Sequence, residues 1–247
     1  MVEGKAPRTV WLTYSEDDGK TWATPVEITA DVKLPSWTWY ATGPGHGIQL
    51  RSGRLVIPCD HVQGTSQEYL ASGFHALSGF YATNGHSHVI YSDDHGASWH
   101  LGGSAQAGTN ESAVVETTDG RLYLNCRNYH PEHDERRAYA WSHDQGESFV
   151  EYGWDESLPE PICQASLARY STAHEHDKDR ILFSNPASDA RKLMTVRLSY
   201  DECQSWTAGK VLHKGLSAYS DLCVLPDMTI CCLYERGTAG LYETLHL

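Results

Sequence analysis

Residues 15–22 read Ser-Glu-Asp-Asp-Gly-Lys-Thr-Trp, and the chain repeats this stretch three more times. The later copies are Ser-Asp-Asp-His-Gly-Ala-Ser-Trp at 92–99, Ser-His-Asp-Gln-Gly-Glu-Ser-Phe at 142–149 and Ser-Tyr-Asp-Glu-Cys-Gln-Ser-Trp at 199–206. The shared pattern is Ser-x-Asp-x-Gly-x-Ser/Thr-aromatic. An internal repeat of this kind sets the architecture of the whole chain.

The repeat has the composition of a tight turn. Its Asp can accept hydrogen bonds from backbone N–H groups just ahead of it, and its Gly supplies a positive φ. The hydroxyl residue can tie the far side, and we expect the aromatic ring to anchor the turn on the protein body. Each copy follows a β-rich run, which predicts a hairpin between two strands. A calcium loop is disfavoured, because the alternating carboxylates and closing Glu of an EF-hand are absent.

The fourth copy departs from the pattern, because Cys203 stands where the other copies have Gly. A side chain in that backbone conformation predicts a strained or altered turn.

Plain hairpins alternate with the repeats, and we expect them to turn at Ser52-Gly53, Asp119-Gly120 and Pro226-Asp227. Further strands are predicted at 163–170, 180–185 and 241–247, residues 63–87 have the composition of a loop, and no helix is predicted. A unit of four strands therefore recurs, which is typical of a β-propeller blade. We expect residues 1–247 to form one all-β domain with its site on the axis, where the innermost strands end.

Composition excludes several classes of function. The net charge of −13 over 247 residues argues against non-specific binding to nucleic acids or anionic membranes. No apolar run approaches the roughly 20 residues of a membrane span, and the first residues lack the apolar core of a signal peptide. The seven cysteines are odd in number and unpatterned, which favours buried free thiols in a reducing compartment, such as the cytoplasm.

The chain resembles the sialidases (exo-α-sialidases, or neuraminidases), whose hallmark is this repeat, the Asp-box or BNR repeat, on a six-bladed β-propeller. The repeat alone also occurs in other propellers. Further segments similar to those of the family strengthen the resemblance: Gly43–Leu50, Asn110–Glu116, Asn125–Asn128, Ser184–Pro186 and Ser217–Leu222. They follow the family's order over essentially the whole chain.

The resemblance implies a site. Tyr219 matches the nucleophile of the family, and Glu111 matches the carboxylate that acts as its base. A neutral tyrosine suits this reaction, because the sugar carries a carboxylate beside its anomeric carbon, and sialidases are the glycosidases that use tyrosine. Arg127 and Arg191 match two of the three arginines that grip the substrate carboxylate, where a planar fork of donors fits. Glu243 lies where the family often has an acid that orients the remaining arginine.

The implied reaction is the hydrolysis of terminal α-linked sialic acid from glycoconjugates, with net retention and without a metal or other cofactor. The implied partners are sialylated glycans. Two short histidine clusters, His86-Ser87-His88 and His174-Glu175-His176-Asp177, have the composition of polar loops rather than of metal sites. We also expect Arg51, Arg54, Arg136 and Arg137 to be surface arginines.

The chain also departs from the family pattern. The segment with the family's first arginine and the Asp that serves as acid/base are not found, so the sequence is expected to begin at about the third blade, with the first one to two blades missing. Three hypotheses follow: an active sialidase, a non-catalytic sialoside-binding module that keeps the two arginines, and a structural Asp-box propeller without a sugar site. Retention of Glu111, Tyr219 and both arginines argues against the third.

Overall fold

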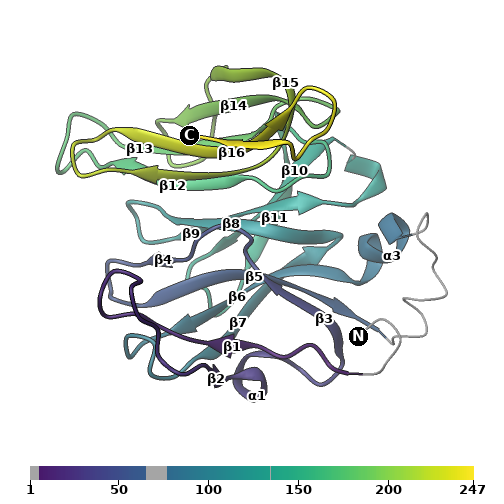
Figure 1. Ribbon diagram of the computed structural model, residues 1–247, viewed down its shortest axis with the longest axis vertical. Helices are drawn as coiled ribbons and strands as arrows, with labels where there is room; N and C mark the ends of the chain where they lie inside the picture. The colour runs from purple at the N-terminus through teal and green to yellow at the C-terminus, as the bar shows by residue number, and fades with distance from the viewer. Residues whose placement is uncertain (1–5, 65–76, 134) are drawn as a thin grey trace.

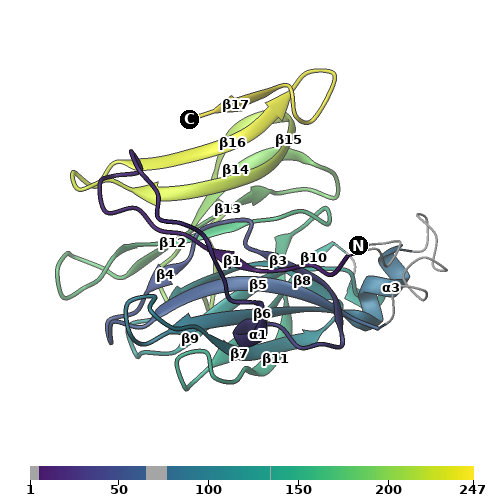
Figure 2. The ribbon, with the colours of Figure 1, turned by 60° about the horizontal axis from the view of Figure 1, so that its bottom comes forward.

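The computed structural model describes residues 6–64, 77–133 and 135–247 of the chain. Within this part, strands dominate and form four sheets. The sheets follow one another in chain order, from β1 and β2 at one end of the molecule to the sheet of β12 to β16 at the other (Figure 1), and β17 continues that last sheet beyond β16 (Figure 2). This succession of antiparallel sheets agrees with the recurring strand units predicted from the sequence.

The first sheet has two strands, β1 (Trp11–Leu12) and β2 (Val26–Glu27). The second has the order β3 (Trp37–Thr42), β5 (Leu55–Gln63), β6 (Gly85–Ser92) and β7 (His100–Ala107), with β4 (Ile48–Gln49) also paired to β5.

The third sheet has the order β8 (Thr109–Glu116), β9 (Leu122–Asn128), β10 (Arg136–Ser142) and β11 (Val150–Pro159). The fourth runs from β12 (Ser166–Ser171) through β13 (Arg180–Pro186), β14 (Lys192–Ser199), β15 (Lys210–Val224) and β16 (Ile230–Gly237) to β17 (Thr244–His246).

The long strand β15 joins two structural units. Its first half, up to Leu216, pairs with β14, and its second half, from Leu216, pairs with β16. The six-stranded sheet is therefore a four-stranded unit that continues into the next one. The second half of β15 carries Tyr219, so this continuation brings the predicted nucleophile to an innermost position.

Apolar side chains fill the spaces between successive sheets. One core cluster joins Val56 and Val89 of the second sheet to Val114 and Leu124 of the third. A second cluster joins the third sheet to the fourth through residues that include Tyr123, Leu167 and Phe183. Because the third sheet is packed on both faces in this way, its strands are held at a fixed spacing from the second and fourth sheets around the candidate site.

The repeat turns have the predicted hydrogen bonds. In the second copy, the Gly96 N–H donates to Ser92 Oγ at 2.8 Å, and the Ser98 N–H donates to Asp94 Oδ1 at 2.8 Å. Equivalent bonds recur in the other three copies. Cys203 has φ +69°, so the fourth copy keeps the left-handed turn despite its side chain, and the predicted strain is confirmed.

The aromatic residue of the repeat does not anchor every turn. Trp99 and Phe149 are buried, at 6% and 4% exposure, and join core clusters. Trp22 of the first copy is instead 63% exposed. The anchoring expected from the sequence is therefore wrong for the first copy.

Two helical segments contradict the prediction of an all-strand chain, namely α1 (Thr29–Val32) and α3 (Leu77–Asn84). The predicted loop at 63–87 is thus wrong for 77–84, β6 already begins at Gly85, and residues 65–76 of it lie outside the described residues. A short 3₁₀ turn, η2 (Pro131–His133), lies between β9 and β10. Among the described residues, none of the helices has both the length and the apolar character that a membrane crossing needs.

Two other expectations need correction. All seven cysteines are free, but only five are buried, since Cys223 is exposed and Cys231 is partly exposed. Arg137 is not a surface residue: its side chain is fully buried, and its Nη1 lies 2.7 Å from Glu160 Oε2, which is equally buried. Its guanidinium also donates to Asn125 Oδ1, so the charge is paired as burial requires.

Candidate active site

The structure brings Tyr219 and Glu111 into direct contact. Glu111 lies on β8 and Tyr219 on β15, and the tyrosine hydroxyl donates to Glu111 Oε1 at 2.5 Å. Burial and the negative charge of Glu111 both hold the pKa of Tyr219 above its ordinary value, so the ground state is a neutral phenol beside a carboxylate. This is the arrangement of a proton donor with its base.

Arg127 binds both members of this pair. From β9 it donates through Nη1 to Glu111 Oε2 at 2.7 Å and to the Tyr219 hydroxyl at 3.1 Å, and through Nη2 to the Tyr129 hydroxyl. Its side chain is 13% exposed. Burial acts against the charged form, but the charges of Glu111, Tyr129 and Tyr219 outweigh burial and raise the pKa of Arg127. Its guanidinium therefore stays a fixed cation at the centre of the cluster.

Arg191 approaches the same tyrosine from another side. It directly precedes β14, and its guanidinium carbon lies 5.7 Å from the centroid of the Tyr219 ring. Its Nη1 donates to the Tyr242 hydroxyl and its Nη2 to the Ile162 carbonyl, each at 2.8 Å. Arg127 and Arg191 thus flank Tyr219, and together they place two guanidinium groups where an anionic ligand can be held.

Glu243 is not part of this cluster of side chains. Its carboxylate accepts hydrogen bonds from the backbone N–H groups of Thr238, Ala239 and Gly240. These bonds lower its pKa to about 2. In the structure Glu243 closes its own loop, and it forms no ion pair with an arginine among the described residues.

Sequence reasoning missed another acid, Glu235, on β16. Its Oε2 accepts a hydrogen bond from the backbone N–H of Tyr219 at 2.9 Å, so it fixes the strand position of the tyrosine. The signal available in the sequence was the hairpin itself. A hairpin that turns at Pro226-Asp227 places residues near 234 and 235 opposite Tyr219 on the partner strand.

A second missed acid is Asp60 on β5. It is 1% exposed, and its Oδ2 accepts from Trp39 Nε1 at 2.9 Å and from Asn110 Nδ2 at 3.3 Å. Burial, aided by the charge of Glu111, raises the pKa of Asp60 to about 7. Asp60 is thus a second carboxyl group coupled to the base, but it lies beneath the surface of the site.

The loop Gly43–Gly47 holds the two reactive strands in register. The Gly43 carbonyl accepts from the Ser112 N–H, one residue after Glu111. His46 Nδ1 lies 2.8 Å from Asp221 Oδ1, two residues after Tyr219. One loop therefore contacts both strands next to their reactive residues.

A cavity beside this loop is distinct from the cluster of Tyr219, Glu111 and Arg127. It has a volume of about 560 Å³ and lies between the innermost strands, with lining residues that include His46, Glu116 and Arg169. Tyr219 and Glu111 do not line it. The candidate site is thus formed by the cluster around Arg127 rather than by this internal space.

Comparisons with known proteins agree with these features. The model of the BNR repeat-like domain family matches residues 1–232. A sialidase of Micromonospora viridifaciens is 36% identical over 241 residues, covering 96% of this chain and 35% of that protein. A sialidase of Bacteroides fragilis is 33% identical, covering 93% and 40%.

A solved structure, the Hadza microbial sialidase Hz136, matches with a TM-score of 0.76 and 32% identity, covering 92% of this chain and 41% of that one. The match confirms the predicted fold as an all-β propeller of sialidase type. The chain spans about a third to two fifths of the length of these relatives.

Proposed function

The chain belongs to the sialidases with BNR repeats, and from this premise we propose that it acts as an exo-α-sialidase on terminal α-linked sialic acid. The sialidase relatives supply the reaction class, and the proposal extends it to this chain. One observation carries it: the Tyr219 hydroxyl lies 2.5 Å from Glu111, and Arg127 binds both.

The proposed first step is attack by the Tyr219 oxygen on the anomeric carbon. As the new C–O bond forms, the phenolic proton passes to Glu111, and the glycosidic C–O bond breaks. The leaving oxygen takes its proton from solvent water. A neutral nucleophile is suited to a sugar that carries a carboxylate next to the reacting carbon, because a carboxylate nucleophile would be repelled there.

In the second step, water attacks the anomeric carbon of the tyrosyl intermediate and releases one proton to the solvent. The Tyr219–carbon bond breaks, and the tyrosine oxygen recovers its proton from Glu111. Each displacement inverts the anomeric carbon, so two displacements give net retention. Glu111 is the base in the first step and the acid in the second. Glu235, bound to the backbone of Tyr219, keeps the nucleophile in place through both steps.

The proposed role of Arg127 and Arg191 is to hold the substrate carboxylate. Arg127 donates to the Tyr219 hydroxyl, and the Arg191 guanidinium lies near the Tyr219 ring. Their other present partners are the hydroxyls of Tyr129 and Tyr242, a backbone carbonyl and Glu111. A neutral partner is exchanged for a charged ligand more readily than a carboxylate is. The ligand would therefore replace the tyrosine hydroxyls on Arg127 Nη2 and Arg191 Nη1, while Arg127 Nη1 stays on Glu111. The proposed partners are sialylated glycoproteins, glycolipids and oligosaccharides.

A second candidate function is sialoside binding without cleavage. Efficient hydrolysis needs an acid at the leaving oxygen, and Asp60, the carboxyl group coupled to Glu111, cannot serve as that acid. It is 1% exposed and bound to Trp39 and Asn110, so it cannot reach the leaving oxygen, and this favours binding without cleavage. Both functions use the same arginines. They differ only in whether the Tyr219 hydroxyl reacts.

The test is Tyr219→Phe, assayed by hydrolysis of an aryl α-sialoside and by calorimetric binding of sialic acid. Hydrolysis should fall by at least about 10²-fold, with binding kept within a few-fold. Tyr14→Phe, which changes an exposed tyrosine two residues after β1, serves as the control. Unchanged hydrolysis would rule out Tyr219 as nucleophile. Binding without hydrolysis in the unmodified protein would favour the binding function, and absence of both would reject both functions.

A further inference from the structure

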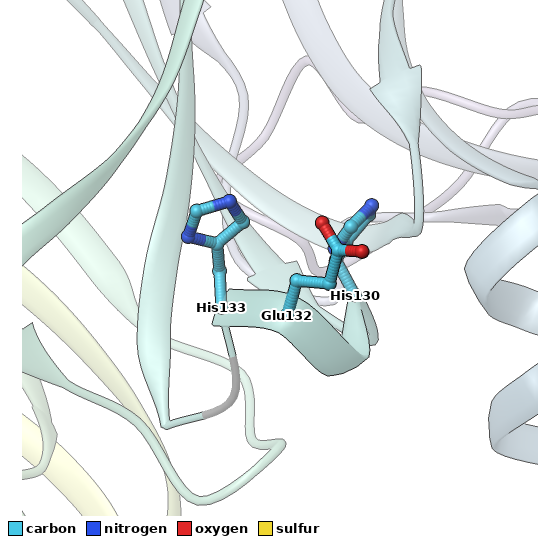
Figure 3. A group of neighbouring side chains, drawn as sticks. All are labelled: His130, Glu132 and His133. Atoms are coloured by element: carbon cyan, nitrogen blue, oxygen red, sulfur yellow. The ribbon is translucent and has the colours of Figure 1, made fainter.

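The turn η2 brings together three potential metal ligands: His130, Glu132 and His133. One ligand atom from each lies within 4.8 Å of the other two. Figure 3 shows the three side chains rising from the same side of the turn. This cluster lies apart from the two histidine segments that the sequence singled out.

The backbone explains why these side chains meet. In a 3₁₀ turn, residues i and i+3 eclipse one another, and here they are the two histidines. The His133 N–H donates to the His130 carbonyl at 3.2 Å and closes the turn. The buried side chain of Asn128 ties both ends, since its Oδ1 accepts from the His130 N–H and its Nδ2 donates to the His133 carbonyl, each at 2.8 Å. These hydrogen bonds fix the backbone positions from which the two histidine side chains extend.

The two imidazole rings have a separation that suits a shared ion. Their centroids are 5.5 Å apart. Two imidazoles bound to a tetrahedral zinc ion at the usual Zn–N distance of about 2.0–2.1 Å would have their centroids about 5 Å apart. The His133 ring also stacks on Trp154, with centroids 3.6 Å apart, which fixes its orientation.

His130 carries a further sign of a ligand. Its Nδ1 is shielded from solvent and has no hydrogen-bond partner among the described residues. A buried ring nitrogen without a partner is costly, and a bound cation would satisfy it. Glu132 is exposed, so its carboxylate can move onto the ion and supply negative charge.

We propose that His130, Glu132 and His133 bind a borderline divalent cation, zinc in the first place, with a fourth position open to solvent. Two imidazoles and one carboxylate form a donor set that zinc takes, whereas magnesium and calcium prefer oxygen ligands alone. The neighbouring residue Tyr129 hydrogen-bonds Arg127. The ion would therefore stabilise the segment that supports the guanidinium in the candidate active site.

The experiment is a titration of the full chain with zinc chloride, in which isothermal calorimetry measures the binding. Cys223 and Cys231 face each other across β15 and β16 and could bind zinc themselves, so the titration is made on the Cys223→Ser/Cys231→Ser variant. One ion per chain is expected. Cobalt should give visible bands without a thiolate charge-transfer band, and magnesium should not bind.

Three variants test the ligands. His130→Ala and His133→Phe should each weaken zinc binding at least about tenfold, and Glu132→Gln should weaken it less. His133→Phe keeps an aromatic ring on Trp154, so loss of binding would not reflect loss of the stack. His143→Ala is the matched control, because His143 and Glu151 form an exposed pair with their atoms 2.7 Å apart on another turn. Zinc binding that is absent in the parent, or unchanged in both histidine variants, would overturn the proposal. No readout depends on sialidase activity, so this test and that of the proposed function fail separately.

Discussion

Tyr219 and Glu111 are 108 positions apart in the sequence, and the hydroxyl of one donates to the carboxylate of the other at 2.5 Å. They belong to β15 and β8, innermost strands of two different units. Propeller geometry alone makes such a contact possible, because it brings the inner ends of separate sheets to one axis. The contact between the two residues is therefore a product of the fold rather than of local sequence.

Glu111→Gln should lower the rate of aryl sialoside hydrolysis by about 10²- to 10⁴-fold, because the phenolic proton loses its acceptor. The fall should appear in kcat more than in KM. Glu116→Gln is the control: it lies on the same strand but pairs with Arg51, outside the reactive cluster. Equal losses in the two variants would contradict the role of Glu111 as base.

Arg127→Lys should weaken binding of sialic acid by about tenfold or more, because an ammonium cannot replace the planar fork and a hydrogen bond to a charged group contributes about 1.5–3 kcal/mol. Hydrolysis should also slow, since Arg127 orients Glu111. Arg121→Lys, which changes a surface pair with Asp119, should leave both unchanged. Calorimetry of sialic acid binding measures the first effect. A normal affinity in Arg127→Lys would exclude the proposed role of Arg127 in holding the substrate carboxylate.

The hairpins and the repeat turns could be predicted because their causes are local. Asp94 and Ser98 are four positions apart, and a turn residue with positive φ suffices to bring them together. The helix α3 could not be predicted in this way. Its sequence contains Gly79 and Asn84, which favour helices poorly. Tyr81 packs on Tyr129, which directly follows the distant strand β9, with ring centroids 5.0 Å apart.

The site was predictable in part for the same reason. Family motifs indicated Tyr219, Glu111 and the arginines, because those residues stand in recognisable segments. The motif could not say which acid approaches Tyr219 from the last hairpin. That choice depends on strand register, which pairs Ser220 with Tyr234 and so brings Glu235, rather than Glu243, to the tyrosine backbone.

The contact between His46 and Asp221 predicts a pH-dependent contribution to stability. The hydrogen bond to Asp221 holds the pKa of His46 above its ordinary value. Burial alone would raise the pKa of Asp221, but the hydrogen bonds that its carboxylate accepts, the one from His46 first among them, together with the charge of His46, outweigh burial, and the pKa of Asp221 is lowered. A raised histidine pKa stabilises the fold below pH 6.5, and this contribution is lost as pH rises through the raised value. A lowered aspartate pKa stabilises the fold above pH 3.8, and this contribution is lost as the pH falls through the lowered value.

The pair should therefore be strongest between those two limits. His46→Gln should lower the thermal midpoint at pH 6 and have a smaller effect at pH 9. The difference should not exceed about 1 kcal/mol, because both side chains are more than a third exposed. Thermal unfolding of both proteins across this pH range provides the measurement, with His143→Gln as the exposed control. An effect of His46→Gln that grows with pH would have the wrong sign for this pair.

The fully buried pair of Arg137 and Glu160 should contribute most to stability among the arginine contacts described here. Arg137→Met leaves the Glu160 charge buried without its partner, so the free energy of unfolding should fall by about 3–5 kcal/mol. Arg136→Met is the matched neighbour. Its pair with Glu156 is largely exposed and should cost no more than about 1 kcal/mol. Adding Glu160→Gln to Arg137→Met removes the stranded charge and should restore part of the loss. Urea denaturation of the four proteins measures these differences, and similar losses for the two arginine variants would show that the buried charge is compensated by other contacts.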